Sequence, residues 1–351
     1  MSGTSSSRPA TILSVQYLRA AAALAVVVFH AMESTATKFP VGAAGVDVFF
    51  VISGFIMWTL TAPAQIRGPA FLWRRFIRIA PPYWIATLLA AALAVVRPGF
   101  LWAPPFDAAD LLRSLAFVPY MDDWGRTYPV LVQGWTLNYE MFFYLVFAAA
   151  LFAPLRWRLA GLSGFFLALA AAGLLMVHRG PAAATYTDLQ VLEFVMGAWL
   201  GEAWLRGRLG GVRLGVALIA TALAAFAATQ MLGLREGPWR VLYWGLPALG
   251  LVSGGLCLER AGLIGRWRIP KALGDGSYSI YLFHLFALAV VDRVLAQAPI
   301  ALRVGAGTVA AAAAGYVLFL ALERPMTAAL RRLPKAFSGR PGAVARAPAG
   351  S

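Results

Sequence analysis

Charged side chains are scarce in this sequence. Only 13% of the 351 residues are charged, whereas 60% are hydrophobic. A soluble globule of this size needs more polar surface than that. The composition therefore excludes an ordinary soluble protein, and it predicts a chain that is covered largely by lipid.

Cysteine, histidine and acidic residues are also few. The one cysteine, Cys257, cannot form an internal disulfide, and histidine occurs three times. The net charge of +15 could suggest a nucleic-acid partner, but the basic residues lie in short clusters between apolar runs. We therefore expect a lipid bilayer as partner, no nucleic acid and no metal site.

Long apolar runs are abundant. A membrane span needs roughly 20 mostly apolar residues, and such runs recur along nearly the whole chain. We predict an all-α, polytopic integral membrane protein of about ten transmembrane helices. The expected spans are residues 14–31, 44–62, 81–96, 135–153, 159–177, 188–205, 212–233, 239–257, 277–296 and 302–322.

The ends of the chain differ in composition from the middle. Residues 1–13 are expected to form a cytoplasmic tail and residues 14–330 a single transmembrane domain. Residues 331–351, rich in Pro, Gly, Ala and Arg, are expected to form a disordered cytoplasmic tail.

The basic residues predict the orientation. With ten spans and the N-terminus inside, 20 Lys and Arg fall in cytoplasmic segments, 9 fall on the opposite side, and Arg19 lies within a span. Positive residues concentrate on the cytoplasmic side of membrane proteins. Both termini are therefore predicted to be cytoplasmic.

Charged groups inside spans are candidates for function, because each costs at least a few kcal/mol to place in a membrane. Arg19 and His30 are eleven residues apart, which on a helix returns to within about 20° of the same face, roughly 16 Å along the axis. The spacing predicts that both face one cavity. Alternatively, Arg19 reaches the inner surface and His30 ends the helix at the outer one.

Other polar residues lie in or near expected spans. Asp47 could partner a cation, and Glu140 stands in an aromatic stretch, where a carboxylate needs a partner or a proton. Ser277, Tyr281 and His284 share one helical face by steps of four and three. Polar contact between helices is the alternative interpretation of these three.

A basic cluster precedes the third expected span. Arg74, Arg75 and Arg78 lie within about one helical turn, and guanidinium groups suit phosphate oxygens. An orientation anchor on the cytoplasmic side explains such a cluster equally well. Tyr83 ends the same segment.

Five segments, taken in order, resemble the membrane acyltransferase type 3 family, which includes bacterial enzymes that O-acetylate surface polysaccharides. The resemblance covers roughly residues 14–330, and the sequence is most similar to those of the exopolysaccharide O-acetyltransferases of this family. The segments are the Arg19 to His30 spacing, the run from Gly45 to Phe55, Arg-Arg-x-x-Arg-Ile-x-Pro-x-Tyr ending at Tyr83, Trp-Thr-Leu-x-x-Glu ending at Glu140, and Ser-Tyr-x-x-Tyr-Leu-x-His ending at His284.

The resemblance implies an enzyme of the bacterial inner membrane. It would take an acetyl group from cytoplasmic acetyl-CoA and deliver it to a sugar hydroxyl of an exported polysaccharide or a lipid-linked saccharide. The resemblance implies that His30 is catalytic, and we add Arg19 and Glu140 to that set. We assign Arg74, Arg75, Arg78 and Tyr83 to donor binding, and Asp47, Ser277, Tyr281 and His284 to substrate binding.

Two questions stay open from the sequence. His30 could be a general base that Glu140 orients, with Arg19 lining the donor channel or stabilising the oxyanion, or it could carry the acetyl group covalently. A transporter or flippase for an anionic glycan intermediate is the alternative function, because buried Arg, Glu and His would serve it too. An inert membrane scaffold is a third possibility.

Overall fold

The computed structural model describes residues 11–33, 38–64, 66–101, 105–177, 179–235 and 237–332, which form helices joined by turns and loops, and no strand occurs in these ranges. Most of the two expected tails, 1–13 and 331–351, lies outside the described residues.

The chain runs through fourteen described α-helices and four short 3₁₀ or π turns. In chain order these are α1 (Leu13–Glu33), η1 (Pro40–Ala44), α2 (Gly45–Thr61), α3 (Gly68–Val96), α4 (Ala108–Leu115), η2 (Val132–Gly134), α5 (Trp135–Ala150), α6 (Leu155–Leu175), α7 (Pro181–Tyr186), α8 (Val191–Leu205), α9 (Val212–Met231), η3 (Val241–Gly245), α10 (Leu246–Arg260), α11 (Arg268–Asp275), α12 (Ser277–Val294), α13 (Ile300–Leu318), η4 (Phe319–Glu323) and α14 (Arg324–Leu330).

Each of the ten expected spans contains a helix. Within the described ranges, eight helical segments are long and apolar enough to cross a membrane, whereas α5 and α8 have only 16 and 15 residues. The prediction of an all-α, polytopic membrane protein is confirmed. The number ten and the cytoplasmic position of both termini stay predictions.

The third expected span begins earlier than the sequence suggested. We expected it to start at Pro81, but α3 begins at Gly68 and continues through Pro81 and Pro82. Prolines are tolerated inside membrane helices when neighbours satisfy the freed backbone groups. Next to the prolines, the Tyr278 hydroxyl of α12 donates to the Ile79 carbonyl at 2.8 Å and joins the two helices. The basic cluster is therefore part of this helix.

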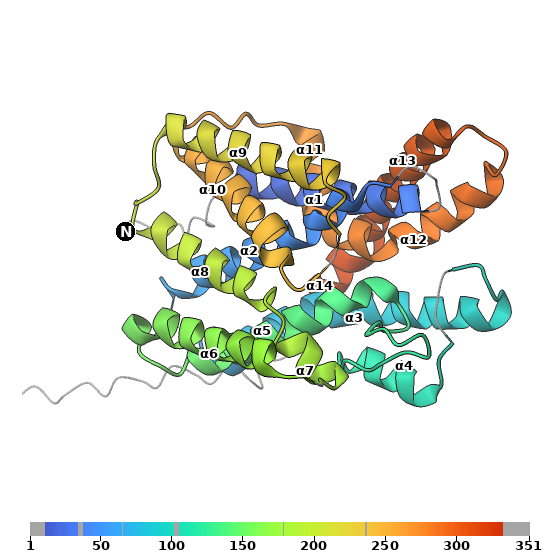
Figure 1. The fold of residues 1–351 in the computed structure, drawn as a ribbon, viewed down its shortest axis with the longest axis horizontal. Helices are drawn as coiled ribbons and strands as arrows, with labels where there is room; N and C mark the ends of the chain where they lie inside the picture. Colours follow the sequence, from blue (N-terminus) through green and yellow to red (C-terminus); the bar gives the residue numbers. More distant parts are fainter. Residues whose placement is uncertain are drawn as a thin grey trace, which may run out of the picture.

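Helix α2 lies in the middle of the bundle. In the segment that contains it, 83% of the apolar window is buried, against 17% in α9. Gly54 of α2 and Gly197 of α8 allow the two backbones to touch, because a Cβ at Gly54 would lie 1.9 Å from the Phe194 carbonyl oxygen. Small residues allow such close packing of membrane helices. Figure 1 shows α9 and α10 along one edge, α5 and α6 along the opposite edge, and α12 beside α13 at one end.

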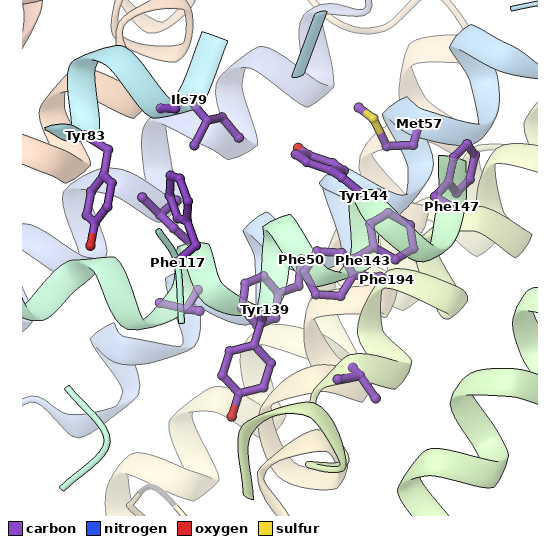
Figure 2. Packing of buried hydrophobic residues seen from close by; sticks show 14 of the residues in the cluster. Phe50, Met57, Ile79, Tyr83, Phe117, Tyr139, Phe143, Tyr144, Phe147 and Phe194 are labelled. Carbon is purple, nitrogen blue, oxygen red and sulfur yellow. The ribbon is translucent and has the colours of Figure 1, made fainter. Parts of the chain in front are cut away.

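Aromatic rings fill the interface between α2, α5 and α8. The ring of Phe194 stacks on Phe50 at 4.4 Å and on Phe143 at 4.5 Å between centroids. Figure 2 shows this row, with Tyr139 at one end and Phe147 and Met57 at the other. Well-packed rings hold these helices at fixed positions, and Phe50 is also part of the wall of the site described next.

Candidate functional site

A cavity of about 120 Å³ lies among α1, α2, α3, α5 and α12, and we call it the arginine cavity. Three guanidinium groups and one carboxylate line it, from Arg19, Arg75, Arg78 and Glu140, in a wall that is otherwise largely apolar. A cationic chamber with apolar walls suits a ligand that carries both phosphates and a hydrocarbon arm. The remaining lining residues are Val46, Phe49, Phe50, Ile52, Ser53, Ile56, Met57, Ile79, Thr136, Leu137, Tyr144, Ser277, Tyr278 and Tyr281.

Glu140 is held inside this cavity by two hydroxyl groups. The Tyr144 hydroxyl donates to its Oε1, and the Ser53 hydroxyl donates to the same oxygen at 3.2 Å. Ser53 thereby joins α2 to α5. These two hydroxyl groups fix the position of the carboxylate in the wall of the cavity.

The cavity also contains polar groups without a hydrogen-bond partner in the described part of the chain. The Ser277 side chain is fully buried, and its Oγ has no hydrogen-bond partner among the described residues. The Nε of Arg75 is buried and equally unpartnered within the described part of the chain. Buried polar atoms are almost always hydrogen-bonded, so these two indicate that a ligand completes the site.

The structure divides the basic cluster. Arg75 and Arg78 line the arginine cavity, whereas Arg74 is exposed on another face of α3 and is absent from the lining. Successive helical residues point about 100° apart, which explains the division. Arg74 therefore fits the orientation-anchor interpretation, and only two members of the expected trio face the cavity.

His30 lies outside the arginine cavity, beside a second histidine. The Nδ1 atom of His30 lies 3.1 Å from the Nε2 of His284 and 2.9 Å from the Val26 carbonyl oxygen. We expected Arg19 and His30 to face one cavity and Glu140 to orient His30. Both expectations are wrong in this geometry: Arg19 and Glu140 line the cavity, His30 does not, and its neighbour is His284.

The hydrogen bonds assign the tautomers of both rings. The His284 Nδ1 lies 2.6 Å from the Tyr281 carbonyl oxygen, which can only accept, so this nitrogen carries a proton. In the neutral ring, Nε2 of His284 is then an acceptor, and the His30 Nδ1 proton is shared between it and the Val26 carbonyl oxygen, which can only accept. His30 therefore carries its lone pair on Nε2, the arrangement of a base oriented by a second group.

Tyr281 connects the histidine pair with the arginine cavity. It lines the cavity, and its ring centroid lies 6.1 Å from that of His284. Its hydroxyl lies 3.0 Å from the Thr136 hydroxyl and donates to the Gln133 carbonyl at 3.1 Å. The pair thus lies directly behind one wall of the cavity.

Comparison with known proteins identifies the family. Residues 12–322 match the model of an acyltransferase domain. The chain belongs to this acyltransferase family. It is 44% identical over 323 residues to the exopolysaccharide production protein ExoZ of Rhizobium meliloti, covering 89% of this chain and 98% of ExoZ. It is 26% identical to the peptidoglycan O-acetyltransferase OatA of Listeria monocytogenes over 80% of this chain and 50% of OatA. No solved structure matches the chain.

Membership of this family makes the chain an acyltransferase and decides against the transporter and scaffold interpretations. The resemblance to the membrane acyltransferase type 3 family is thereby confirmed. Within the described ranges, no group of three or more His, Cys, Asp or Glu side chains is placed to hold a metal ion.

Two residues assigned to ligand binding in this acyltransferase have other contacts. Tyr83 is fully buried, its hydroxyl donates to the Ser114 carbonyl at 3.1 Å, and its ring packs on Phe117. The bond to Ser114 secures α4 to α3, Figure 2 shows Tyr83 beside Phe117, and Tyr83 does not line the arginine cavity. Asp47 is fully buried in an ion pair with Arg240, at 2.7 Å, and is likewise absent from the lining.

Sequence reasoning missed several members of the site. Tyr144 follows Glu140 by one helical turn, a spacing that places both on one face. The spacing of these two residues could therefore have identified Tyr144 from the sequence. Three more side chains, those of Ser53, Thr136 and Tyr278, line the same cavity because of helix packing. No local sequence pattern predicts that they meet.

Proposed function

We propose that this acyltransferase moves an acetyl group from acetyl-CoA to a hydroxyl of an exported polysaccharide or lipid-linked saccharide, in the bacterial inner membrane. Two features support the proposal together: the cavity lined by three arginines, and the histidine pair behind its wall. The names of ExoZ and OatA support the acceptor class, since one concerns exopolysaccharide and the other O-acetylation of peptidoglycan.

The donor phosphates would bind Arg75 and Arg78. Guanidinium groups form strong, charge-assisted hydrogen bonds with phosphate oxygens. Both side chains come from the N-terminal half of α3, which the charge asymmetry predicts to be cytoplasmic, the side from which acetyl-CoA arrives. The apolar wall would cover the pantetheine arm and bring the thioester toward Tyr281.

His30 would act as the general base. Its Nε2 takes the proton from the acceptor hydroxyl as the hydroxyl oxygen attacks the thioester carbonyl carbon. The carbon–sulfur bond then breaks, and the departing coenzyme A thiolate receives a proton from the imidazolium. His284 would position His30 by accepting from its Nδ1, the role that the sequence had suggested for Glu140.

Arg19 would line the donor channel. It lies in the arginine cavity, about 16 Å along α1 from His30, too far to contact the carbonyl that is attacked there, and a guanidinium group cannot act as a proton carrier. A covalent acetyl-histidine is the competing route. Trapping of acetylated protein from donor alone would favour that route, whereas direct transfer leaves the enzyme unmodified.

Analysis of the polysaccharide tests the function directly. Mass spectrometry of the surface polysaccharide from a strain lacking this gene should show the loss of acetyl groups, restored by the wild-type gene but not by a His30→Ala copy. Purified wild-type protein should also transfer labelled acetyl from acetyl-CoA to the deacetylated polysaccharide. Unchanged acetylation in the deletion strain would contradict the proposal.

A further inference from the structure

The arginine cavity is elongated along α2. Its lining residues on this helix run from Val46 to Met57, a separation of eleven residues that corresponds to roughly 16 Å along the helix axis. Because a volume of about 120 Å³ is spread over this length, the cavity is narrow. A donor that enters at one end must therefore extend along the cavity to reach the other end.

The histidine pair lies beyond one end of this cavity. Arg19 marks the far end, because it stands about 16 Å from His30 along α1. On α12 the lining begins at Ser277 and ends at Tyr281, one turn before His284. Donor phosphates bound near Arg19 would thus be held far from the histidine pair, and the acyl end of the donor would point toward that pair.

Two aromatic rings close the end of the cavity next to the histidine pair. Phe49 of α2 and Tyr281 of α12 both line the cavity, and their ring centroids lie 6.0 Å apart in an edge-to-face contact. We call these two residues the aromatic wall. Beyond it, the Tyr281 ring lies 6.1 Å from the His284 ring, which lies 4.8 Å from the His30 ring. An acyl group that approaches His30 from the cavity meets the aromatic wall first.

Hydrogen bonds fix the tyrosine of the aromatic wall. Tyr281 is buried, its hydroxyl lies 3.0 Å from the Thr136 hydroxyl, and it donates to the Gln133 carbonyl at 3.1 Å. The Gln133 amide in turn donates to the Leu282 carbonyl at 3.2 Å. These bonds join α12 to the start of α5, so the ring cannot swing aside without breaking them.

Packing fixes the phenylalanine of the aromatic wall. Phe49 packs against the apolar cluster between α1 and α12 that includes Ala23, Val27 and Ile280. Close-packed side chains yield little, and forcing extra methylene groups against them costs free energy. The aromatic wall therefore limits the space for an acyl chain at this end of the cavity.

We propose that the aromatic wall determines the length of the acyl group that the enzyme transfers: it accommodates an acetyl group and excludes longer chains. This inference rests on the proposed function, which it extends by naming the residues that select the donor. Phe49 and Tyr281 would act on specificity alone, and neither would exchange a proton or form a bond with the substrate.

A competition between two donors tests the inference. Purified protein receives equal concentrations of acetyl-CoA and butyryl-CoA with the deacetylated polysaccharide, and mass spectrometry counts the acetyl and butyryl groups transferred. The product ratio equals the ratio of the two kcat/KM values, so it does not depend on how much of each preparation is active. The wild type should favour acetyl by about 100-fold or more, because one methylene group in a pocket already changes specificity by about 10–200-fold.

Truncation of the wall should relax this preference. Phe49→Ala should lower it to about tenfold or less, because the change opens space at the end of the cavity. Phe49→Leu, which keeps more of the packing, should give an intermediate value. Ile56→Ala is the matched control, because Ile56 lines the same cavity on the same face of α2 but seven residues, about 10 Å, from Phe49. Its truncation should leave the preference for acetyl unchanged.

Three results would overturn the inference and leave the proposed function standing. They are equal transfer of acetyl and butyryl groups by the wild type, a preference that survives Phe49→Ala, and an equal loss of preference in the Ile56→Ala control. A wild type that transfers neither group from its coenzyme A thioester would instead overturn the proposed function, and this inference with it.

Discussion

The first two turns of α5 separate two cavities of different chemistry. One face, with Thr136, Leu137 and Glu140, lines the arginine cavity. The other, with Trp135, Asn138 and Tyr139, lines a cavity of about 460 Å³ among the loops before α5, between α7 and α8 and before η3, the loop cavity. The first cavity combines guanidinium groups with aliphatic and aromatic side chains, and the second combines them with the amides of Asn138 and Gln190. The two faces of one helix thus meet two different chemical environments.

The sidedness of the two cavities gives the largest contrast. The one cysteine, Cys257, is buried, so the native chain should label weakly. An Arg113→Cys variant should react with a membrane-impermeant maleimide in spheroplasts, whereas Arg208→Cys should react only after permeabilisation, because ten spans place these loops on opposite sides. Labelling of both from the outside would mean that the number of spans between them is even rather than three, and the two cavities would not face opposite compartments.

Removal of the base should have the next largest effect, and it should leave both cavities intact. His30→Ala should lower acetyl transfer by about 10²–10⁴-fold, the usual contribution of a general base. His284→Ala should cost less, because it contacts His30 and positions it. Initial rates with labelled acetyl-CoA measure both, and unchanged binding of each substrate is the control. Near-normal transfer by the His30 variant would exclude this residue as the base.

Substitution in the arginine cavity should affect the donor alone. Arg75→Gln with Arg78→Gln should raise the KM for acetyl-CoA by about tenfold or more, since each charged hydrogen bond is worth about 1.5–3 kcal/mol. The KM for the saccharide should stay near the wild-type value. Arg74→Gln is the matched control, because Arg74 neighbours Arg75 in sequence but points away from the cavity. An equal effect from all three positions would show that the charge of the whole segment matters rather than the cavity.

The smallest effect should come from Tyr83→Phe. The change removes the hydrogen bond to the Ser114 carbonyl, which should lower the free energy of unfolding by about 1 kcal/mol. The KM for acetyl-CoA should not change, because the tyrosine does not line the arginine cavity. Thermal melting and donor titration measure the two quantities. A clear rise in KM would restore the donor-binding role suggested by the sequence.

The family resemblance and the helical class were predictable from the sequence because they depend on local patterns. Apolar runs about the length of a bilayer predict helices wherever they occur, since lipid leaves the backbone no other way to satisfy its hydrogen bonds. The short motifs likewise identified Arg19, Arg75, Arg78, Glu140, Ser277 and Tyr281, all of which line one cavity. The predicted start of the third span at Pro81 was wrong, because proline interrupts a helix less often in a membrane than in a soluble protein.

Only the tertiary structure decided which of these residues meet. Helical periodicity states that Arg19 and His30 share a face of α1, but it cannot state which helix covers each end of that face. The packing of α12 against α1 places His284 beside His30, while α3 and α5 bring Arg75, Arg78 and Glu140 to Arg19. The same holds for Asp47, whose partner Arg240 is 193 residues away. Contacts at such separations follow from how helices fit together, and no local pattern encodes that fit.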